Sequence, residues 1–384
     1  MLHTDSTRGY VWIHTVLLIS VILGVILTSG CDYVPSRDVH VLKLDAQGNE
    51  EWHRVIDSGE DDTASAVIET ESGDYVIAGD FAHIGKYDPR LRLTTLDPRG
   101  EIKSQIDIEG YNDPSALIQT RDKGYAITTR LTGDVLRLDE QGHILWTIHP
   151  MGNIHSIIQE PTGDFMVAGT VWNRSLHDDA VIARISENGR VLWQNLYGGY
   201  GFFEAYSIIP FSKGDFLISG LGTLPLKGGN KIWILFINYD GSVKWERFLG
   251  DTMPNSYITL RETPDSGFEA LAILVSDDTA RIDGSALIKY SVNIPENTSA
   301  ESHILSGNPL AIWTNAGGIA AIGSIRDNEF REYSLSYPSD PHILKFDTLG
   351  LLLWEKILKK DYVGNAKSMI QTSDNGFIIV GTTE

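Results

Sequence analysis

Histidines and clustered acids are the residues of this chain that could hold a metal ion or move protons. Five histidines fall in segments that we expect to be connections: His83, His149, His155, His177 and His303. Zinc takes three or four converging ligands, but no three of these histidines are close together in the sequence, and none forms a His-x-x-x-His pair. We therefore expect them to bind no metal.

A short acidic run, Asp57-Ser58-Gly59-Glu60-Asp61-Asp62, could at first sight bind calcium. In the twelve-residue calcium loop, however, the ligands alternate along the chain and a glutamate closes the end. The run lacks that spacing, so we expect a solvated acidic loop. The single cysteine of the chain also excludes an internal disulfide and a thiolate-rich metal site.

Catalytic signatures are missing from the sequence. It contains no Gly-x-Ser-x-Gly elbow, no phosphate-binding loop and no dinucleotide fingerprint. We therefore predict no cofactor and assign no catalytic residue. Acids are plentiful, so a pair of them facing a channel stays open as the basis of an enzyme.

The one cysteine, Cys31, follows an uncharged apolar stretch from Val11 to Leu27 and the small residues Thr28-Ser29-Gly30. This layout is typical of a secretory signal, and it resembles a bacterial lipoprotein signal with its lipobox. The resemblance implies a signal peptide over residues 1–30, a lipid on Cys31 and a tether over residues 31–37. An uncleaved membrane anchor or an ordinary cleaved signal remains the alternative. In each case the rest of the chain lies outside the cytoplasm, in the periplasm or at the cell surface.

The charge balance narrows the choice of partner. The 384 residues include 31 Lys and Arg against 51 Asp and Glu, which gives a net charge of −20. Nucleic-acid binding depends on basic side chains that neutralise phosphates, so we expect none. Membrane contact should depend on the lipid at Cys31, because the chain lacks the basic excess that holds a protein on anionic lipid. We expect a monomer.

Residues 38–384 contain two alternating repeat motifs. The first has branched apolar residues, an Asp-x-x-Gly turn and a tryptophan, as in Val41–Trp52, Val135–Trp146 and Ile343–Trp354. Other copies end at Trp193 and Trp245, a degraded copy has Ser104 in the tryptophan position, and a more degraded one starts at Ala286. The aspartate should accept a hydrogen bond from the backbone two residues on, and the glycine should take a positive φ.

The second motif is another apolar hairpin, which turns on a glycine just before an aromatic residue, as in Gly124-Tyr125 and Gly376-Phe377. Clear copies are Ala66–Gly79, Ser156–Gly169, Ser207–Gly220 and Ser368–Gly381, and weaker copies lie near Ala116, Tyr257 and Leu310. With seven copies of each motif, every unit of about fifty residues should form a four-stranded antiparallel sheet.

Four-stranded sheets repeated at this length are typical of a β-propeller. The chain begins with the first motif and ends with the second, so we predict that the two terminal hairpins complete one blade and close the ring. The sequence therefore predicts an all-β, seven-bladed β-propeller over residues 38–384. Six or eight blades remain open because two units are degraded. The tryptophans should pack between neighbouring sheets.

This repeat pattern resembles the quinoprotein-like and WD40-like propeller lipoproteins of bacteria and archaea. The resemblance covers nearly all of residues 38–384 and implies the architecture rather than one activity, because unrelated functions share this fold. It implies no quinone site here, because enzymes of that group use a vicinal disulfide and this chain has one cysteine.

The two faces of such a ring differ. Short, stereotyped turns inside the hairpins emerge on one face, which we call the short-turn face. Connections of variable length emerge on the other, the variable-loop face, where a rigid scaffold commonly carries binding residues. That second face is rich in aromatic residues, which are enriched at protein interfaces. The candidate binding residues are Trp172, Tyr197, Tyr200, Phe202, Phe203, Phe330, Tyr333 and Tyr337, with Tyr362 as a further aromatic of this face.

Together these features predict a lipid-anchored protein of the cell envelope that binds or scaffolds a protein partner through the variable-loop face. One alternative is an envelope hydrolase or lyase acting on glycans or peptides at the mouth of the channel. Such an enzyme should have a deep polar pocket with two or more acids of perturbed pKa. A surface adhesion or sensory module is a third possibility.

Overall fold

The computed structural model describes residues 37–59, 61–82, 90–173, 177–199, 201–211, 214–223, 231–249, 258–263, 267–275, 285–291, 304–324, 341–359 and 365–382. These residues all belong to one compact unit, Arg37–Glu384. The predicted signal peptide and Cys31 lie outside the described residues.

Every helix or strand assigned in the described residues is a β-strand. The first half of the unit contains β1 (Val39–Leu44), β2 (Glu50–Ile56), β3 (Asp61–Glu69), β4 (Tyr75–Ala82), β5 (Arg90–Leu96), β6 (Ile102–Ile108), β7 (Pro114–Gln119), β8 (Tyr125–Thr129), β9 (Val135–Leu138), β10 (Ile144–Ile148), β11 (Asn153–Gln159), β12 (Phe165–Asn173), β13 (His177–Ile185) and β14 (Val191–Tyr197). The second half contains β15 (Phe202–Phe211), β16 (Asp215–Thr223), β17 (Lys231–Ile237), β18 (Val243–Leu249), β19 (Ile258–Glu262), β20 (Phe268–Val275), β21 (Ser285–Ser291), β22 (Ile304–Trp313), β23 (Ile319–Ser324), β24 (Pro341–Phe346), β25 (Leu352–Ile357), β26 (Asn365–Gln371) and β27 (Phe377–Thr382).

Antiparallel pairing together with the repeat motifs groups these strands into seven blades within the described part of the chain. Pairing alone does not separate blades 5 and 6, because β21 also pairs with the start of β22. Blades 1 to 4 are β3–β6, β7–β10, β11–β14 and β15–β18; blade 5 is β19–β21; blade 6 is β22–β25; and blade 7 is β26, β27, β1 and β2. The all-β propeller architecture is confirmed, and the grouping agrees with the seven blades predicted. In blade 5, the most degraded copy in the sequence, the start of β22 pairs with β21, whereas the end of β22 pairs with β23 of blade 6.

Blade 7 closes the ring as predicted. Its strand order is β26-β27-β1-β2, and β1 pairs antiparallel with β27 from Val39 opposite Thr382 to Leu44 opposite Phe377. The last hairpin therefore supplies the two inner strands and the first hairpin supplies the two outer ones. Pairing the two ends of the chain removes a free sheet edge.

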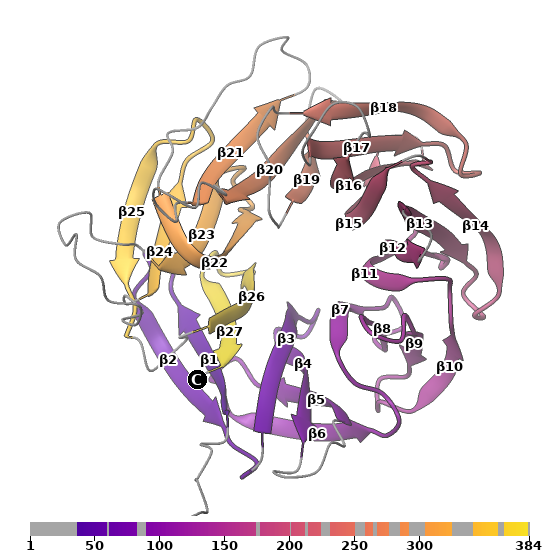
Figure 1. Cartoon of the computed structure of the whole chain (residues 1–384). Helices are drawn as coiled ribbons and strands as arrows, with labels where there is room; N and C mark the ends of the chain where they lie inside the picture. The colour runs from indigo at the N-terminus through magenta and orange to yellow at the C-terminus, as the bar shows by residue number, and fades with distance from the viewer. Residues whose placement is uncertain are drawn as a thin grey trace, which may run out of the picture. The chain divides into compact units, whose positions relative to one another are not determined.

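The first strand of each blade lies nearest the common centre, as Figure 1 shows for β3, β7, β11 and β26. Neighbouring first strands contact each other, β26 with β3, β3 with β7, and β7 with β11, and the series continues through β15. β22 in turn contacts β26. The fourth strands, such as β2, β6 and β10, lie at the outside.

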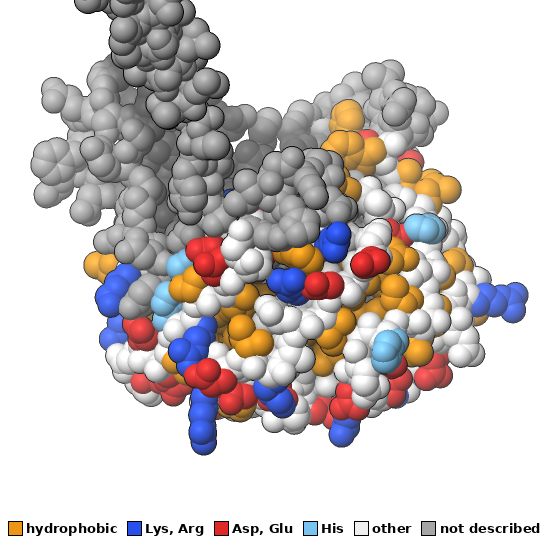
Figure 2. Space-filling view, turned by 90° about the horizontal axis from the view of Figure 1, so that it is seen from below, with side chains coloured by type: hydrophobic (Ala, Val, Ile, Leu, Met, Phe, Trp, Pro, Cys, Tyr) orange, Lys and Arg blue, Asp and Glu red, His pale blue; other side chains and the backbone are white. Residues whose placement is uncertain are grey.

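Burial follows this radial order. All six residues of β1 and of β27 are buried, because these middle strands face a neighbouring blade on both sides. Outer strands such as β25 alternate between half-buried and exposed residues. Figure 2 shows one side of the molecule, where hydrophobic side chains lie among acidic and basic ones.

The Asp-x-x-Gly turns have the predicted chemistry. Asp45 Oδ1 accepts hydrogen bonds from the backbone N–H of Gln47 (2.9 Å) and Asn49 (2.8 Å), and Gly48 has φ +78°. Asp97 and Asp139 accept equivalent pairs of hydrogen bonds in blades 1 and 2.

The second motif turns differently from the prediction. In blades 2 and 7 the residue with positive φ is Lys123 (+68°) or Asn375 (+66°), one place before the glycine. Gly124 is required by close approach instead, because a methyl group there would lie 2.2 Å from the Leu138 carbonyl oxygen. In this turn one residue must therefore adopt a positive φ, and the next residue must have no side chain.

Within the described residues, no helix has the length and apolar character needed to cross a bilayer.

Candidate functional site

The described part of the variable-loop face contains an exposed aromatic pair, Trp172 and Phe202. Trp172, near the end of β12, is 69% exposed, and Phe202, at the start of β15, is 50% exposed. Both residues pair with Asp178 of β13, Trp172 from one side and Phe202 from the other. They therefore lie in one row of neighbouring strands, about 10 Å apart. We call them the Trp172–Phe202 pair.

Two other predicted binding residues belong to the core, and this part of the site prediction is corrected. Phe203 is 1% exposed and packs edge-on against Trp233, with ring centroids 5.2 Å apart. Tyr197 is 9% exposed, and its hydroxyl donates a hydrogen bond to the Gly241 carbonyl (2.6 Å). Side chains alternate along a strand, so Phe203 must point inward where Phe202 points outward.

Gly198 and Gly201 are needed for the packing of the Phe203 ring. A methyl group at Gly198 would lie 2.6 Å from the Phe203 ring, and one at Gly201 would lie 2.9 Å from it. These glycines make room for a buried ring, so they are not evidence of a flexible loop. Four other predicted binding residues, Tyr200, Phe330, Tyr333 and Tyr337, lie outside the described residues, as does Tyr362.

The described connection histidines do not converge. His155 packs against Tyr206 with ring centroids 5.5 Å apart, and burial lowers its pKa to about 4, which keeps the ring neutral at pH 7. His149 is exposed, and its Nδ1 contacts the Asp134 carboxylate. His83 and His303 lie outside the described residues.

The acidic run on this face is more ordered than a solvated loop. Asp57 is exposed as expected, but Asp62 is only 4% exposed, and its carboxylate accepts hydrogen bonds from the Ser58 N–H (2.8 Å) and hydroxyl (2.7 Å). A third acid, Asp38, joins them: one oxygen from each of the three carboxylates lies within 4.8 Å of the others. Asp38 comes beside Asp57 because Val39 pairs with Ile56 in the β1–β2 hairpin, a register that the sequence prediction of a hairpin did not specify.

Burial raises the pKa of Asp38, and the charges of Asp57 and Asp62 raise it further. Burial also raises the pKa of Asp62 and outweighs the hydrogen bonds from Ser58, which lower it. The site thus disfavours ionisation of Asp38 and of Asp62. Ca²⁺ takes six to eight oxygen ligands, so three carboxylates alone do not define a calcium site.

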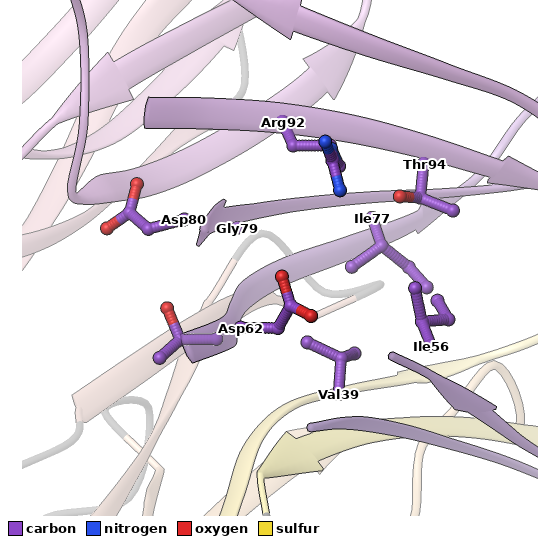
Figure 3. A pocket seen from close by; sticks show the side chains of 9 residues that line it. Val39, Ile56, Asp62, Ile77, Gly79, Asp80, Arg92 and Thr94 are labelled. Atoms are coloured by element: carbon purple, nitrogen blue, oxygen red, sulfur yellow. The ribbon is translucent and has the colours of Figure 1, made fainter. Parts of the chain in front are cut away.

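A small cavity between blades 7 and 1 adjoins this cluster (Figure 3). Val39, Ile56 and Ile77 line its apolar side, and Asp62, Asp80, Arg92 and Thr94 line its polar side. Burial raises the pKa of Asp80 to about 6, although its carboxylate accepts the Asp113 N–H at 2.9 Å. The cavity measures about 20 Å³, which is space for about one water molecule. The perturbed acids expected of an enzyme are present, but no described pocket beside them could admit a substrate.

The opposite, short-turn face contains two larger cavities. One, of about 690 Å³, is lined by the hairpin turns of blades 1, 2 and 7, including Glu69, Arg121 and Ser373. The second, of about 440 Å³, lies between blades 1 and 2. Sequence reasoning assigned this face a structural role and did not foresee a cavity on it.

Tryptophans pack between blades as predicted. Trp52 of blade 7 packs against Tyr75 of blade 1 (centroids 6.0 Å), and Trp146 of blade 2 against Phe165 of blade 3 (5.7 Å). The indole N–H of Trp52 also donates to the Pro98 carbonyl (3.0 Å) in the next blade. Each such ring lies over the turn glycine of that blade: a methyl group at Gly100 would lie 2.8 Å from Trp52.

Comparisons with known proteins bear on the fold alone. No protein-family model matches the sequence, and no curated protein matches it significantly. The solved structure of U3-55K is similar, with a TM-score of 0.53 and 10% identity over 90% of this chain and 98% of that one. A streptogramin B lyase (TM-score 0.48, 11% identity, 90% of this chain and 98% of that chain) is also similar. So is the C-terminal WD40 domain of Sif2 (TM-score 0.48, 10% identity, 87% and 85%). The strand pairing of the described residues gives the β-propeller fold that the sequence resemblance implied.

Proposed function

We propose that this chain is a lipid-anchored β-propeller of the cell envelope that binds a protein partner through its variable-loop face. The Trp172–Phe202 pair is the observation that carries the proposal. Large aromatic side chains left half or more exposed are over-represented at interfaces and dominate their energetics. The pair is held on paired strands rather than on a free loop, so little entropy is lost when a partner binds.

The entry of the chain into the propeller supports a membrane-proximal partner. Asp38 precedes β1 at the variable-loop face, and Arg37 is held there by an ion pair with Asp61 (2.6 Å) and a hydrogen bond from the Asp62 N–H to its carbonyl (2.7 Å). Six Cα–Cα steps separate Cys31 from Arg37, a span of at most about 20 Å. A lipid on Cys31 would therefore hold this edge of the variable-loop face close to the bilayer.

Site-specific photocrosslinking in native envelopes tests the binding role. A photoreactive amino acid in place of Trp172 should give a discrete crosslinked product, which the additional change Phe202→Ala should diminish. The matched control is the same photoreactive residue at Leu349, which is 80% exposed in a turn of the short-turn face. Equal products from both positions, or none from position 172, would contradict the proposal.

The anchor is tested separately. Metabolic labelling with a fatty acid should mark the unsubstituted chain and not Cys31→Ser, which should leave the membrane fraction. Equal labelling of both proteins would rule out lipidation at Cys31 and leave the binding proposal standing.

The enzyme alternative retains one supporting observation, the raised pKa values of Asp38, Asp62 and Asp80. The adjoining cavity is too small for a glycan or a peptide. Binding is therefore the function that the geometry of the described residues supports best.

A further inference from the structure

Blade 1 departs from the repeat at two positions that face each other. In blades 7 and 2 the third strand supplies Lys43 or Arg137 directly opposite Trp52 or Trp146 of the fourth strand. In blade 1 the same pair of positions is Thr95 opposite Ser104. Two of the largest side chains of the repeat are thus replaced by two small ones at one place.

The cavity of about 440 Å³ between blades 1 and 2 lies at these truncated residues. Its lining includes Asp74, Thr95, Lys103, Ser104, Tyr125 and Glu140, and we call it the Ser104 notch. Lys103 forms an ion pair with Asp74 (2.6 Å) at its edge. Blades 1 and 2 are neighbours in the ring, and β3 contacts β7 (Figure 1).

The notch keeps the features with which the repeat holds an indole. Tyr125 occupies the position of Tyr75 and Phe165, the rings against which Trp52 and Trp146 pack. Glu140 occupies the turn position of Glu187, whose carbonyl accepts the Trp146 N–H at 2.9 Å. Residues equivalent to those that hold an indole are therefore present, with Tyr125 8% exposed, and the indole itself is missing.

The chain fills the gap only in part. Ile106 lies over Gly142, the turn glycine of blade 2: a methyl group there would be 2.8 Å from Ile106 Cδ1. This replaces the contact that Trp52 makes with Gly100 in the preceding interface. The side of the notch toward Tyr125 and Ser104 stays open as cavity.

We propose that the Ser104 notch binds the indole of a tryptophan side chain presented by a partner polypeptide. The larger cavity of the short-turn face shares Thr70, Glu71, Ser72 and Gln119 with the notch. Residues that flank the tryptophan in the partner thus have a continuous path toward the hairpin turns of blades 1, 2 and 7. This second surface is on the face opposite the Trp172–Phe202 pair and is independent of the function proposed above.

Fluorine NMR with a blocked Gly-Trp-Gly peptide carrying 5-fluorotryptophan tests the proposal on the purified mature chain. The fluorine signal should broaden on addition of the unsubstituted protein. Ser104→Trp supplies the chain's own indole and should weaken binding at least tenfold. Leu349→Trp adds an indole to a turn of blade 6, outside the notch, and should bind like the unsubstituted chain.

A second blocking variant guards against misfolding of Ser104→Trp. Thr95→Phe copies blade 4, where Phe236 packs against Trp245 (centroids 5.2 Å) beside the Lys244–Asp215 ion pair. It fills the notch from the other side and should weaken binding by a similar factor. Absence of binding to the unsubstituted chain, or undiminished binding to a folded blocking variant, would overturn the proposal.

Discussion

An indole from one blade packs over a turn glycine of the next blade. This packing predicts that two similar glycine substitutions lower the free energy of unfolding by different amounts. Gly73 and Gly100 are both in blade 1, both have a positive φ (+83° and +81°), and both close a hairpin turn. Their surroundings differ. A methyl group at Gly73 would find its nearest atom, Pro98 Cγ, at 4.0 Å, whereas one at Gly100 would lie 2.8 Å from the Trp52 ring.

The magnitudes follow from these distances. Left-handed backbone costs an alanine about 1–2 kcal/mol at either position. Overpacking against the half-buried Trp52 ring costs about 1–3 kcal/mol more, and only Gly100 has that contact. We expect Gly73→Ala to lower the free energy of unfolding by about 1.5 kcal/mol and Gly100→Ala to lower it by about 3 kcal/mol.

Urea denaturation followed by circular dichroism measures both values, and a double-mutant cycle identifies the cause. When Trp52→Ala is already present, adding Gly100→Ala should cost no more than Gly73→Ala does in the original chain. Equal costs for the two glycine substitutions, or an undiminished cost of Gly100→Ala without Trp52, would refute the packing account.

Three further predictions concern charged side chains. The pKa of Asp80 is raised to about 6 from its ordinary 3.8, so its protonation stabilises the fold most below about pH 4, and this contribution is lost as the pH rises through 6. Asp80→Asn should therefore be more stable than the original chain at pH 7, by at most about 3 kcal/mol. If the stability difference between the two proteins is the same at pH 4 and pH 7, Asp80 is not responsible. Burial raises the pKa of Asp374, but hydrogen bonds from Lys43, Thr372 and Gly376 outweigh this and lower the pKa to about 2. The contribution of Asp374 to the free energy of unfolding is therefore present above pH 4 and lost toward pH 2. Asp374→Asn should make stability depend less on pH on the acid side, and an equally steep dependence would contradict this. Arg184 is buried and contacts Glu160 (3.1 Å) and Asp164 (2.7 Å). Arg184→Met leaves Glu160 buried without its cation and should lower the free energy of unfolding, measured by heat or urea, by about 3–5 kcal/mol. A decrease below about 1 kcal/mol would mean that Glu160 has another partner.

The repeats made the fold predictable. Each copy contains its own strands, its own turn chemistry and its own tryptophan, so the same inference could be checked along the chain. The complementary ends of the sequence predicted the closing blade, and the pairing of β1 with β27 confirms it.

The site was less predictable, because its residues are defined by neighbours that are distant in sequence. Phe202 and Phe203 are adjacent aromatics, but Phe202 is exposed and Phe203 is buried, because successive side chains of β15 point to opposite faces. Asp38 joins Asp57 and Asp62 through the register of the β1–β2 hairpin, where Val39 pairs with Ile56. The substitution of Ser104 for tryptophan was visible in the sequence, but the cavity also required Thr95 to lie opposite it.

Ring closure is the claim on which both faces depend, and engineered disulfides test it most directly. In a Cys31→Ser background no other thiol is present, and cysteines at Val41 and Val380, or at Leu42 and Ile379, would face each other across β1 and β27. One of two successive antiparallel pairs has the closer Cα spacing of a non-hydrogen-bonded pair, which suits a disulfide. Oxidation of the folded protein should link at least one pair within a single chain, as shown by mass spectrometry, whereas the equally buried control pair of Val41 and Ile234 should stay reduced. Failure of both facing pairs to link in folded protein would contradict the closed ring.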